Sequence, residues 1–354
     1  MRELLDDEAS TTRQRDQAGL PLLSIEDLSV TFSRKGSSTT AVDKVSYSVS
    51  SGEIVGVVGE SGSGKSVTAL AVMGLLPDRG VEVTGKVIYG GRNLLTLRDR
   101  EMERLRGSDI AMVFQDPMSS LNPVVPIGTQ VAEVLQAHNS VTRAQAMSEA
   151  AHLLNRCGIP DPNRRLREYP YQLSGGMRQR VMIAIALACK PKLLICDEPT
   201  TALDVTIQAQ VIELLKELVH DLGTAMIMIT HDLGVVAGLC DHVNVMYAGR
   251  IVESAARQEL FALPRHRYTH GLLSSIPRLD APRGEPLRPI PGTPRDTVSW
   301  DRACAFAPRC GHVTDACVRP GIELTPVAGD VADHRMRCVH PAQNPVLEPT
   351  GVAR

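Results

Sequence analysis

Residues 59–66 read Gly59-Glu60-Ser61-Gly62-Ser63-Gly64-Lys65-Ser66 and match the pattern G-x-x-x-x-G-K-[ST] at every fixed position. An apolar run at 54–58 precedes them and predicts a buried strand, and a helical pattern begins at Val67. The glycines let backbone N–H groups turn toward phosphate oxygens, which the helix N-terminus also attracts. Lys65 is expected to reach the β- and γ-phosphates of a nucleotide, and Ser66 to ligate Mg²⁺. The stretch predicts an α/β fold with a nucleotide site.

Two carboxylates, Asp197 and Glu198, follow a second predicted strand at 193–196. They would lie at the carboxyl edge of the sheet, where α/β proteins bind their ligands. Asp197 suits Mg²⁺ binding, directly or through water, and Glu198 suits polarising an attacking water. Alone, such a pair is more often a solvated turn, but together with the phosphate loop it indicates a hydrolytic site.

Other segments continue the α/β pattern from Leu22 onward. Residues 226–229 predict another buried strand, and a helical pattern precedes it, with Asp204 as its N-cap and Gly223 as its end. A mainly helical stretch at 131–156 has a different character and predicts a helical insertion. Thirteen of the 23 prolines fall at or after Pro264, so the C-terminal part is not expected to form a regular layer.

Composition and charge exclude several classes of protein. The 354 residues include 38 Lys and Arg against 40 Asp and Glu, a balance unlike that of a surface that coats nucleic acid. Only 4 Phe, 6 Tyr and 1 Trp are present to stack on bases. No apolar run reaches the roughly 18–20 residues of a membrane helix, and residues 1–17 are too polar and acidic for a signal peptide. We therefore expect a cytoplasmic compartment.

Residues 173–180 read Leu-Ser-Gly-Gly-Met-Arg-Gln-Arg and resemble the signature motif of the ATP-binding cassette (ABC) ATPases. The resemblance covers about residues 22–260. It implies a P-loop NTPase fold of the ABC nucleotide-binding type at 22–263, with a helical subdomain at about 116–180. A disordered leader (1–21) would precede it, and a small, loop-rich extension containing cysteines (264–354) would follow.

The family's site residues map onto positions in this sequence. Phe32 would stack on adenine, Gln115 would contact Mg²⁺ and the attacking water, and His231 would lie near the γ-phosphate. Ala202-Leu203-Asp204 resembles the D-loop. The signature residues, which would open a helix toward the γ-phosphate of ATP on an opposite subunit, are Leu173, Ser174, Gly175, Gly176 and Met177.

Three features narrow the resemblance to the oligopeptide, dipeptide and nickel importer ATPases: residues 115–123, Met177 in the signature, and residues 197–210. The resemblance implies peptide import at the cytoplasmic face of the cell membrane, with no nucleic acid as partner. The implied partners are a second, non-identical ATPase subunit, two permeases and an extracytoplasmic solute-binding protein. The permeases would dock between Gln115 and the helical insertion.

Other functions stay open at this point. One is nickel import, and another is a cassette that acts on ribosomes or DNA, although such proteins usually carry two cassettes or a long coiled-coil insertion. A non-hydrolysing regulatory subunit would be expected to lack Glu198, His231 or the signature, and all three are present.

Four of the eight cysteines, Cys304, Cys310, Cys317 and Cys338, gather near the C-terminus, as in extensions of the same subfamily. Four thiolates suit a [4Fe–4S] cluster or a structural zinc ion, while unliganded thiols or disulfides are the alternative, and the spacing does not choose among them. Neighbouring arginines, Arg309 among them with Arg335 and Arg337, are expected to offset thiolate charge. The other cysteines, Cys157, Cys189, Cys196 and Cys240, lie in apolar patterns typical of buried core thiols.

Overall fold

The computed structural model describes residues 20–34, 36–201, 203–276, 289–293, 303–327, 329 and 333–343. Nearly all of the predicted leader at 1–21 lies outside these ranges, as does Ala202 of the predicted D-loop. Within the described ranges, no helix is long and apolar enough to cross a lipid bilayer.

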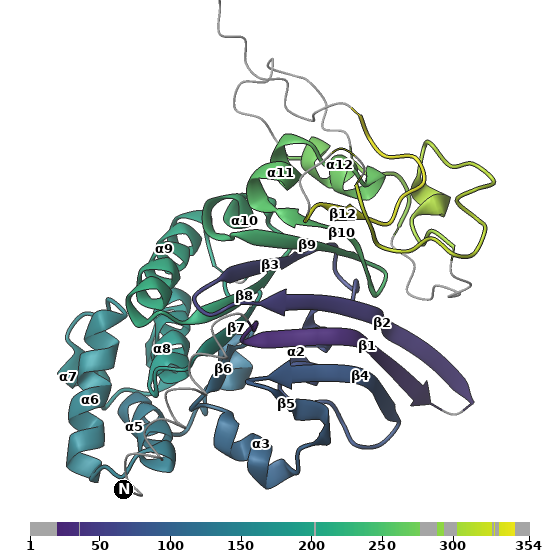
Figure 1. Ribbon diagram of the computed structural model, residues 1–354. Coiled ribbons are helices and arrows are strands. Elements are labelled where there is room, and N and C mark those ends of the chain that lie inside the picture. Colours follow the sequence, from purple (N-terminus) through teal and green to yellow (C-terminus); the bar gives the residue numbers. More distant parts are fainter. Residues whose placement is uncertain are drawn as a thin grey trace, which may run out of the picture.

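A mixed central sheet carries the predicted strands and runs in the order β11-β12-β10-β9-β3-β8-β7-β6 (Figure 1). The five strands from β9 to β6 are parallel, and β10, β12 and β11 join one edge antiparallel. The predicted strands at 54–58, 193–196 and 226–229 are β3, β7 and β8, apolar throughout because both faces are covered. The bounds are β3 (Ile54–Val58), β6 (Ile110–Val113), β7 (Leu193–Asp197), β8 (Ala225–Thr230), β9 (His242–Tyr247), β10 (Arg250–Ala256), β11 (Thr325–Pro326) and β12 (Arg335–Met336).

A second, antiparallel sheet in the order β2-β1-β4-β5 covers one face of the central sheet. One apolar core lies between the two sheets and includes residues of α2, the helix that begins at Lys65. The elements of this layer are β1 (Leu23–Arg34), β2 (Ser37–Val49), α2 (Lys65–Val72), β4 (Val81–Tyr89), β5 (Arg92–Asn93), η1 (Leu94–Thr96) and α3 (Asp99–Leu105).

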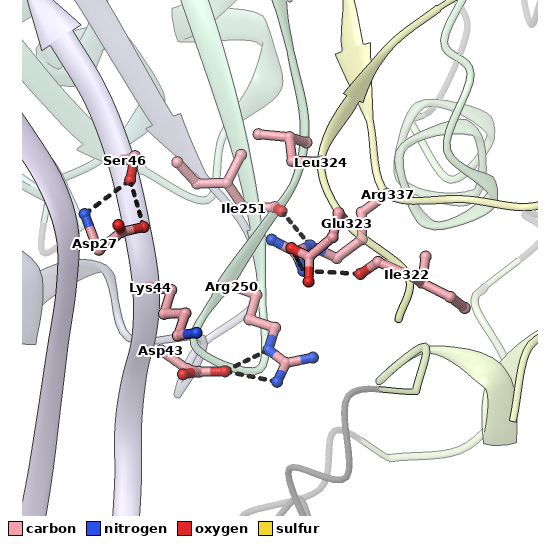
Figure 2. Close-up of a pocket in the computed structure, with 10 residues that line it drawn as sticks. All are labelled: Asp27, Asp43, Lys44, Ser46, Arg250, Ile251, Ile322, Glu323, Leu324 and Arg337. Atoms are coloured by element: carbon pink, nitrogen blue, oxygen red, sulfur yellow. Dashed lines mark hydrogen bonds and ion pairs between the residues drawn. The ribbon is translucent and has the colours of Figure 1, made fainter. Parts of the chain in front are cut away.

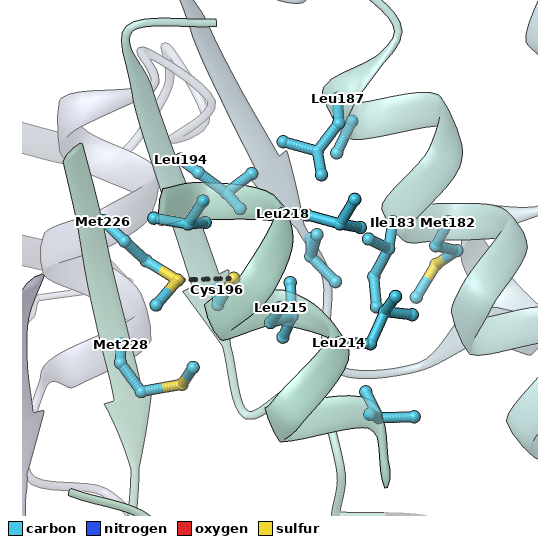
Figure 3. Close-up of a cluster of buried hydrophobic side chains, with 14 of the residues drawn as sticks. Met182, Ile183, Leu187, Leu194, Cys196, Leu214, Leu215, Leu218, Met226 and Met228 are labelled. Atoms are coloured by element: carbon cyan, nitrogen blue, oxygen red, sulfur yellow. Dashed lines mark hydrogen bonds between the residues drawn. The ribbon is translucent and has the colours of Figure 1, made fainter. Parts of the chain in front are cut away.

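Helices α8 (Gly175–Leu187) and α9 (Val205–Leu222) cover the opposite face. Figure 3 shows their Leu, Ile and Met side chains against Cys196 of β7 and Met226 and Met228 of β8. Asp204 caps α9 by accepting a hydrogen bond from the Ile207 N–H at 3.0 Å, and Gly223 ends the helix with φ 63°, as predicted. This packing holds the signature helix α8 against the strand that ends in Asp197.

The predicted helical stretch at 131–156 is two helices, α5 (Ile127–His138) and α6 (Arg143–Arg156), which pack on each other. The chain leaves α5 at Asn139, and Thr142 begins α6 through a capping box with Gln145. Short helices lie on either side of this pair: α4 (Pro117–Ser120) before it, then α7 (Pro162–Arg165) and η2 (Pro170–Gln172).

The C-terminal extension joins the edge of the central sheet, because β12 pairs with β10 (Figure 1). Buried Glu253 of β10 accepts hydrogen bonds from the His266 N–H at 2.9 Å and from His334 Nε2 at 2.8 Å. The helices on this side are α10 (Leu233–Leu239), α11 (Arg257–Ala262), α12 (Arg267–Ser274) and the short η3 (Ala307–Arg309). The Pro-rich segment thus packs directly on the cassette through a buried, hydrogen-bonded carboxylate.

Of the four cysteines predicted to be core residues, Cys157, Cys196 and Cys240 are buried and Cys189 is half-buried. Burial raises the pKa of Cys157 and of Cys240 to about 12, so these thiols stay protonated and unreactive at neutral pH. Cys189 lies near the insertion, where Asn139 contacts its sulfur.

Candidate nucleotide site

The phosphate loop opens onto a cavity of about 600 Å³ at the carboxyl edge of the parallel strands. Residues Glu60 to Ser66 line one side of this cavity. Gln115, Glu198 and His231 line it from three other segments of the chain. The fold therefore brings the predicted loop and all three predicted catalytic side chains to one space.

Lys65 is buried at the base of the loop, with 4% of its surface exposed. Its Nζ donates hydrogen bonds to the carbonyl oxygens of Gly59 at 2.8 Å and Glu60 at 3.0 Å. Burial lowers the pKa of Lys65, and the neighbouring carboxylates, Glu198 first, oppose that shift. The ammonium group is thus held inside the curve of the loop, beside the cavity that a polyphosphate would enter.

Gly64 is one of the loop positions where glycine is required. It is the N-cap of α2 and has φ 99°, a left-handed conformation. A Cβ there would lie 2.5 Å from the carbonyl oxygen of Ala41, too close for any other residue. The glycine thus permits the turn that directs the first N–H groups of α2 toward the cavity.

Ser66 and Asp197 face each other across the first turn of α2 and the end of β7. Ser66 Oγ donates a hydrogen bond to Asp197 Oδ1 at 2.8 Å. Burial raises the pKa of Asp197, and this hydrogen bond opposes the shift. A hydroxyl and a carboxylate are hard oxygen ligands of the kind that Mg²⁺ takes together with substrate phosphates. The donor set therefore fits Mg²⁺.

Glu198 is the centre of the site. Its Oε2 accepts hydrogen bonds from Gln115 Nε2 at 3.1 Å and Thr201 Oγ1 at 2.9 Å. The same oxygen lies 3.3 Å from His231 Nδ1, and Oε1 lies 3.9 Å from Lys65 Nζ. Its backbone has φ 47°, a strained conformation for glutamate. Such strain is typical of functional positions, and here it accompanies a carboxylate surrounded by polar groups.

The remaining predicted residues lie elsewhere. Phe32 lies on β1 opposite Thr39 and packs partly against the core between the sheets, and it does not line this cavity. Ser174 caps α8 by accepting from the Met177 N–H at 3.3 Å. Leu173 is buried, whereas Ser174, Gly175 and Asp204 are exposed and do not line the cavity. Gly176 lies against α9, where a Cβ would be 2.6 Å from Ile207 Cγ2.

Sequence reasoning missed three residues that contact the site. Thr201 could have been found from the sequence, because it lies only three residues after Glu198, whose carboxylate it contacts. Tyr268 of α12 and Arg309 of η3 both contact Glu60, although more than 200 residues separate them from it. Arg309 does not act as a counter-charge for the cysteines, as its position in the sequence suggested, because its guanidinium pairs with the Glu60 carboxylate.

The four C-terminal cysteines are free thiols. Cys304 lies near Cys317 and Cys338, and Cys338 lies near Cys310 and Cys317. The Cys304 N–H donates to the Cys317 carbonyl at 2.9 Å. Burial raises the pKa of Cys304 to about 11, and the thiols of Cys338 and Cys317 add to that shift. In the part of the chain that the structure describes, no group of three or more His, Cys, Asp or Glu side chains could hold a metal ion as it stands.

Comparison with known proteins decides the family. A family model described as ABC transporter matches residues 42–201, and one for the oligopeptide/dipeptide transporter C-terminal region matches residues 252–317. The oligopeptide transport ATP-binding protein OppD of Escherichia coli (strain K12) is 49% identical over 321 residues, which are 90% of this chain and 95% of that protein. This chain belongs to the ABC transporter ATPases. Within that family it falls among the oligopeptide and dipeptide ATP-binding subunits, and it is an ATP-hydrolysing cassette.

Other members of the family support the same placement. The dipeptide transport ATP-binding protein DppD of Bacillus subtilis (strain 168) is 49% identical over 299 residues, 84% of this chain and 89% of that protein. An ABC cassette solved as a dimer in a post-hydrolysis state with ADP and phosphate superposes with a TM-score of 0.60. The two sequences are 26% identical, and the superposition covers 98% of that cassette and 66% of this chain. The predicted ABC fold is therefore confirmed.

Proposed function

We propose that this ABC ATPase energises the import of peptides through separate permease subunits. The observation that carries the proposal is the placement of Glu198 between Lys65, Gln115 and His231 at the mouth of the phosphate loop. The match to the oligopeptide/dipeptide transporter C-terminal model and the names of OppD and DppD support peptides as the substrate class.

The side chains have distinct tasks in this proposal. The loop N–H groups and Lys65 bind the β- and γ-phosphates, for which Lys65 exchanges the carbonyls of Gly59 and Glu60 for phosphate oxygens. Glu198 accepts a proton from the attacking water, and Gln115 and His231 orient that carboxylate and the water. Mg²⁺, held by Ser66 and Asp197 with Gln115 nearby, would neutralise phosphate charge. Phe32 would stack on the adenine once nucleotide is bound.

The exposed signature supports a second cassette as partner. Ser174 and Gly175 open α8 toward solvent, away from the cavity of their own chain. Free N–H groups at a helix N-terminus suit a phosphate brought by another subunit. We infer a head-to-tail dimer of two ATPase subunits, a heterodimer in this subfamily, with Leu173 to Met177 and Asp204 facing the partner's nucleotide.

Exposed apolar side chains support a docking face for the permeases beside Gln115 and the insertion. Val124 is 78% exposed, Tyr171 63%, Met118 56% and Phe114 37%. Several large apolar residues exposed in one part of a surface are typical of an interaction site. We infer that the chain sits peripherally on the cytoplasmic face of the membrane, with a solute-binding protein on the other side.

A mild-detergent pull-down with this chain as bait tests the transport proposal. Two permeases and a second ATPase are expected to co-purify, and peptides to be the solute bound by the associated binding protein. Val124→Glu is expected to reduce permease recovery at least tenfold, because it buries a charge in the docking face. The matched control Val318→Glu, at an exposed valine of the extension, should leave recovery unchanged. Recovery of ribosomes or DNA, or nickel as the solute, would contradict the proposal.

We further propose that the four C-terminal cysteines hold a [4Fe–4S] cluster in preference to zinc. Their proximity and free state support four-thiolate ligation. A [4Fe–4S] cluster takes one thiolate for each of its four irons, which matches the number of cysteines in this segment. The centre would hold the loop-rich extension together.

Anaerobic purification followed by iron, sulfide and zinc analysis checks this assignment. We expect about four irons and four sulfides per chain, and their loss in Cys304→Ser. Cys189→Ser, at the half-buried cysteine beside the insertion, should keep the full content. A preparation with neither iron nor zinc would rule out a metal centre, and one zinc per chain would overturn the choice of metal.

A further inference from the structure

Glu60, the second residue of the phosphate loop, is held through three different groups: its N–H, its carbonyl and its carboxylate. Its N–H donates to Tyr268 Oη at 2.9 Å, and its carbonyl oxygen accepts from Lys65 Nζ at 3.0 Å. Its carboxylate binds Arg309 through two parallel hydrogen bonds, Nη1 to Oε2 at 2.6 Å and Nη2 to Oε1 at 3.0 Å. Since Tyr268 and Arg309 lie beyond the predicted cassette boundary at 263, elements outside the cassette set the shape of its phosphate loop.

Arg309 is itself fixed on every side. It is 8% exposed, and its guanidinium lies 5.8 Å from the ring centre of Tyr247 and 6.0 Å from that of Phe306. Its Nε donates to the Pro291 carbonyl at 2.9 Å. A planar, bidentate and stacked guanidinium holds a carboxylate in one orientation, which a lysine ammonium does not. The Arg309–Glu60 ion pair is therefore held in one geometry, unlike a mobile ion pair on the surface.

The cysteine segment sets the position of Arg309. Arg309 ends the turn η3 between Cys304 and Cys310, and backbone hydrogen bonds tie Ala307 to Cys304 and Cys310 to Ala307. Phe306 of the same segment packs edge-on against Tyr247, with ring centres 5.4 Å apart. A change in the cysteine segment that moves this turn must therefore also move the guanidinium that holds Glu60.

We propose that Arg309 is a positioning residue for the phosphate loop and couples the four-cysteine segment to ATP affinity. Two effects act in the same direction. The Arg309–Glu60 contact keeps the loop in its binding shape, so less order has to be acquired when ATP binds. It also neutralises a carboxylate that lines the cavity and would otherwise repel the phosphates. The inference rests on the proposed role of residues 59–66 as the phosphate-binding loop.

A second contact keeps the extension in place independently of Arg309 (Figure 2). Arg337, next to Cys338, donates to the carbonyl of Ile251 in β10 at 3.2 Å and to that of Ile322 at 2.9 Å. Nearby, Arg250 of β10 pairs with Asp43 of β2 at 2.6 Å. With β12 also paired to β10, the extension stays docked when Arg309 is changed. Substitution at Arg309 thus tests the Arg309–Glu60 ion pair without undocking the extension.

The test is the affinity of the full-length chain for a non-hydrolysable ATP analogue with Mg²⁺. Arg309→Met, which keeps the packing volume, is expected to weaken binding about tenfold, within the usual range for coupled sites, and Arg309→Lys less. In a Glu60→Gln background the same change should cost little, because no charge remains to be neutralised or held. Arg319→Gln, at an exposed arginine of the same extension, is the control and should bind normally.

Hydrogen exchange gives a readout that a purely structural role would not move. Because coupling is reciprocal, the analogue should slow exchange at residues 303–317 in the unmodified chain and not in Arg309→Met. Unchanged affinity in Arg309→Met, or an equal loss in the Glu60→Gln background, would overturn the inference. If Arg309→Met does not fold, Arg309→Lys and the exchange data on the unmodified chain decide. Undiminished binding by Lys65→Ala would instead refute the nucleotide site itself.

Discussion

Replacing Lys65 by alanine is expected to abolish productive ATP binding. Lys65 Nζ lies within the curve of the phosphate loop, and among the residues that the structure describes no other Lys or Arg side chain lines this cavity. Without the ammonium, only the backbone N–H groups and the Mg²⁺ that Ser66 and Asp197 would hold remain to offset the triphosphate charge. Removal of a single preorganised donor to developing charge typically lowers turnover about 10²–10³-fold. We expect at least that loss, together with a large rise in the Kd for ATP.

Two measurements separate this effect from misfolding. Lys65 also donates to two loop carbonyls, so thermal unfolding of Lys65→Ala should be recorded beside nucleotide binding. Lys86→Ala is a suitable control, because that lysine is 61% exposed on β4 and should leave ATP binding intact. A folded Lys65→Ala variant with normal affinity and turnover would contradict the assigned phosphate contact.

Glu198→Gln is expected to stop hydrolysis while leaving ATP bound. Glutamine matches glutamate in shape and still accepts hydrogen bonds from Gln115 and Thr201, but it is not a base. General-base catalysis typically contributes about 10²–10⁴-fold to a rate, and we expect a loss of that size. The substitution also removes a negative charge 3.9 Å from Lys65 Nζ, so ATP affinity should not fall.

The assay is phosphate release by the assembled transporter, with dimerisation in ATP measured in parallel. Glu198→Gln should accumulate an ATP-bound closed dimer, since the step that reopens it is blocked. Glu213→Gln on α9, whose side chain is 63% exposed, should behave as the unmodified chain does. Normal turnover by Glu198→Gln would remove Glu198 from the role of base and leave the water to another group.

Much of the fold follows from local pattern. The strands at 54–58, 193–196 and 226–229 are apolar throughout, and such runs flanked by turns form strands buried on both faces. Asp204 begins α9 and Gly223 ends it. The N-terminus of a helix needs a side-chain acceptor and the C-terminus favours a residue that adopts a left-handed conformation, and both residue types can be recognised in the sequence. The helical insertion was harder to predict from the sequence. One helical pattern at 131–156 is interrupted at 139–142, where the Thr142 and Gln145 side chains favour a new N-terminus over continuation.

The sequence by itself determined the chemistry available to this protein: a loop that binds phosphate, a carboxylate pair at a strand end, a signature, and four clustered cysteines. These depend on residue type and near-neighbour spacing, which the chain carries directly. Only the tertiary structure decided that Glu198, Gln115 and His231 share one cavity, and that Arg309 holds Glu60 instead of serving the cysteines. Those contacts join residues up to 249 positions apart, and packing, not local pattern, brings such residues together.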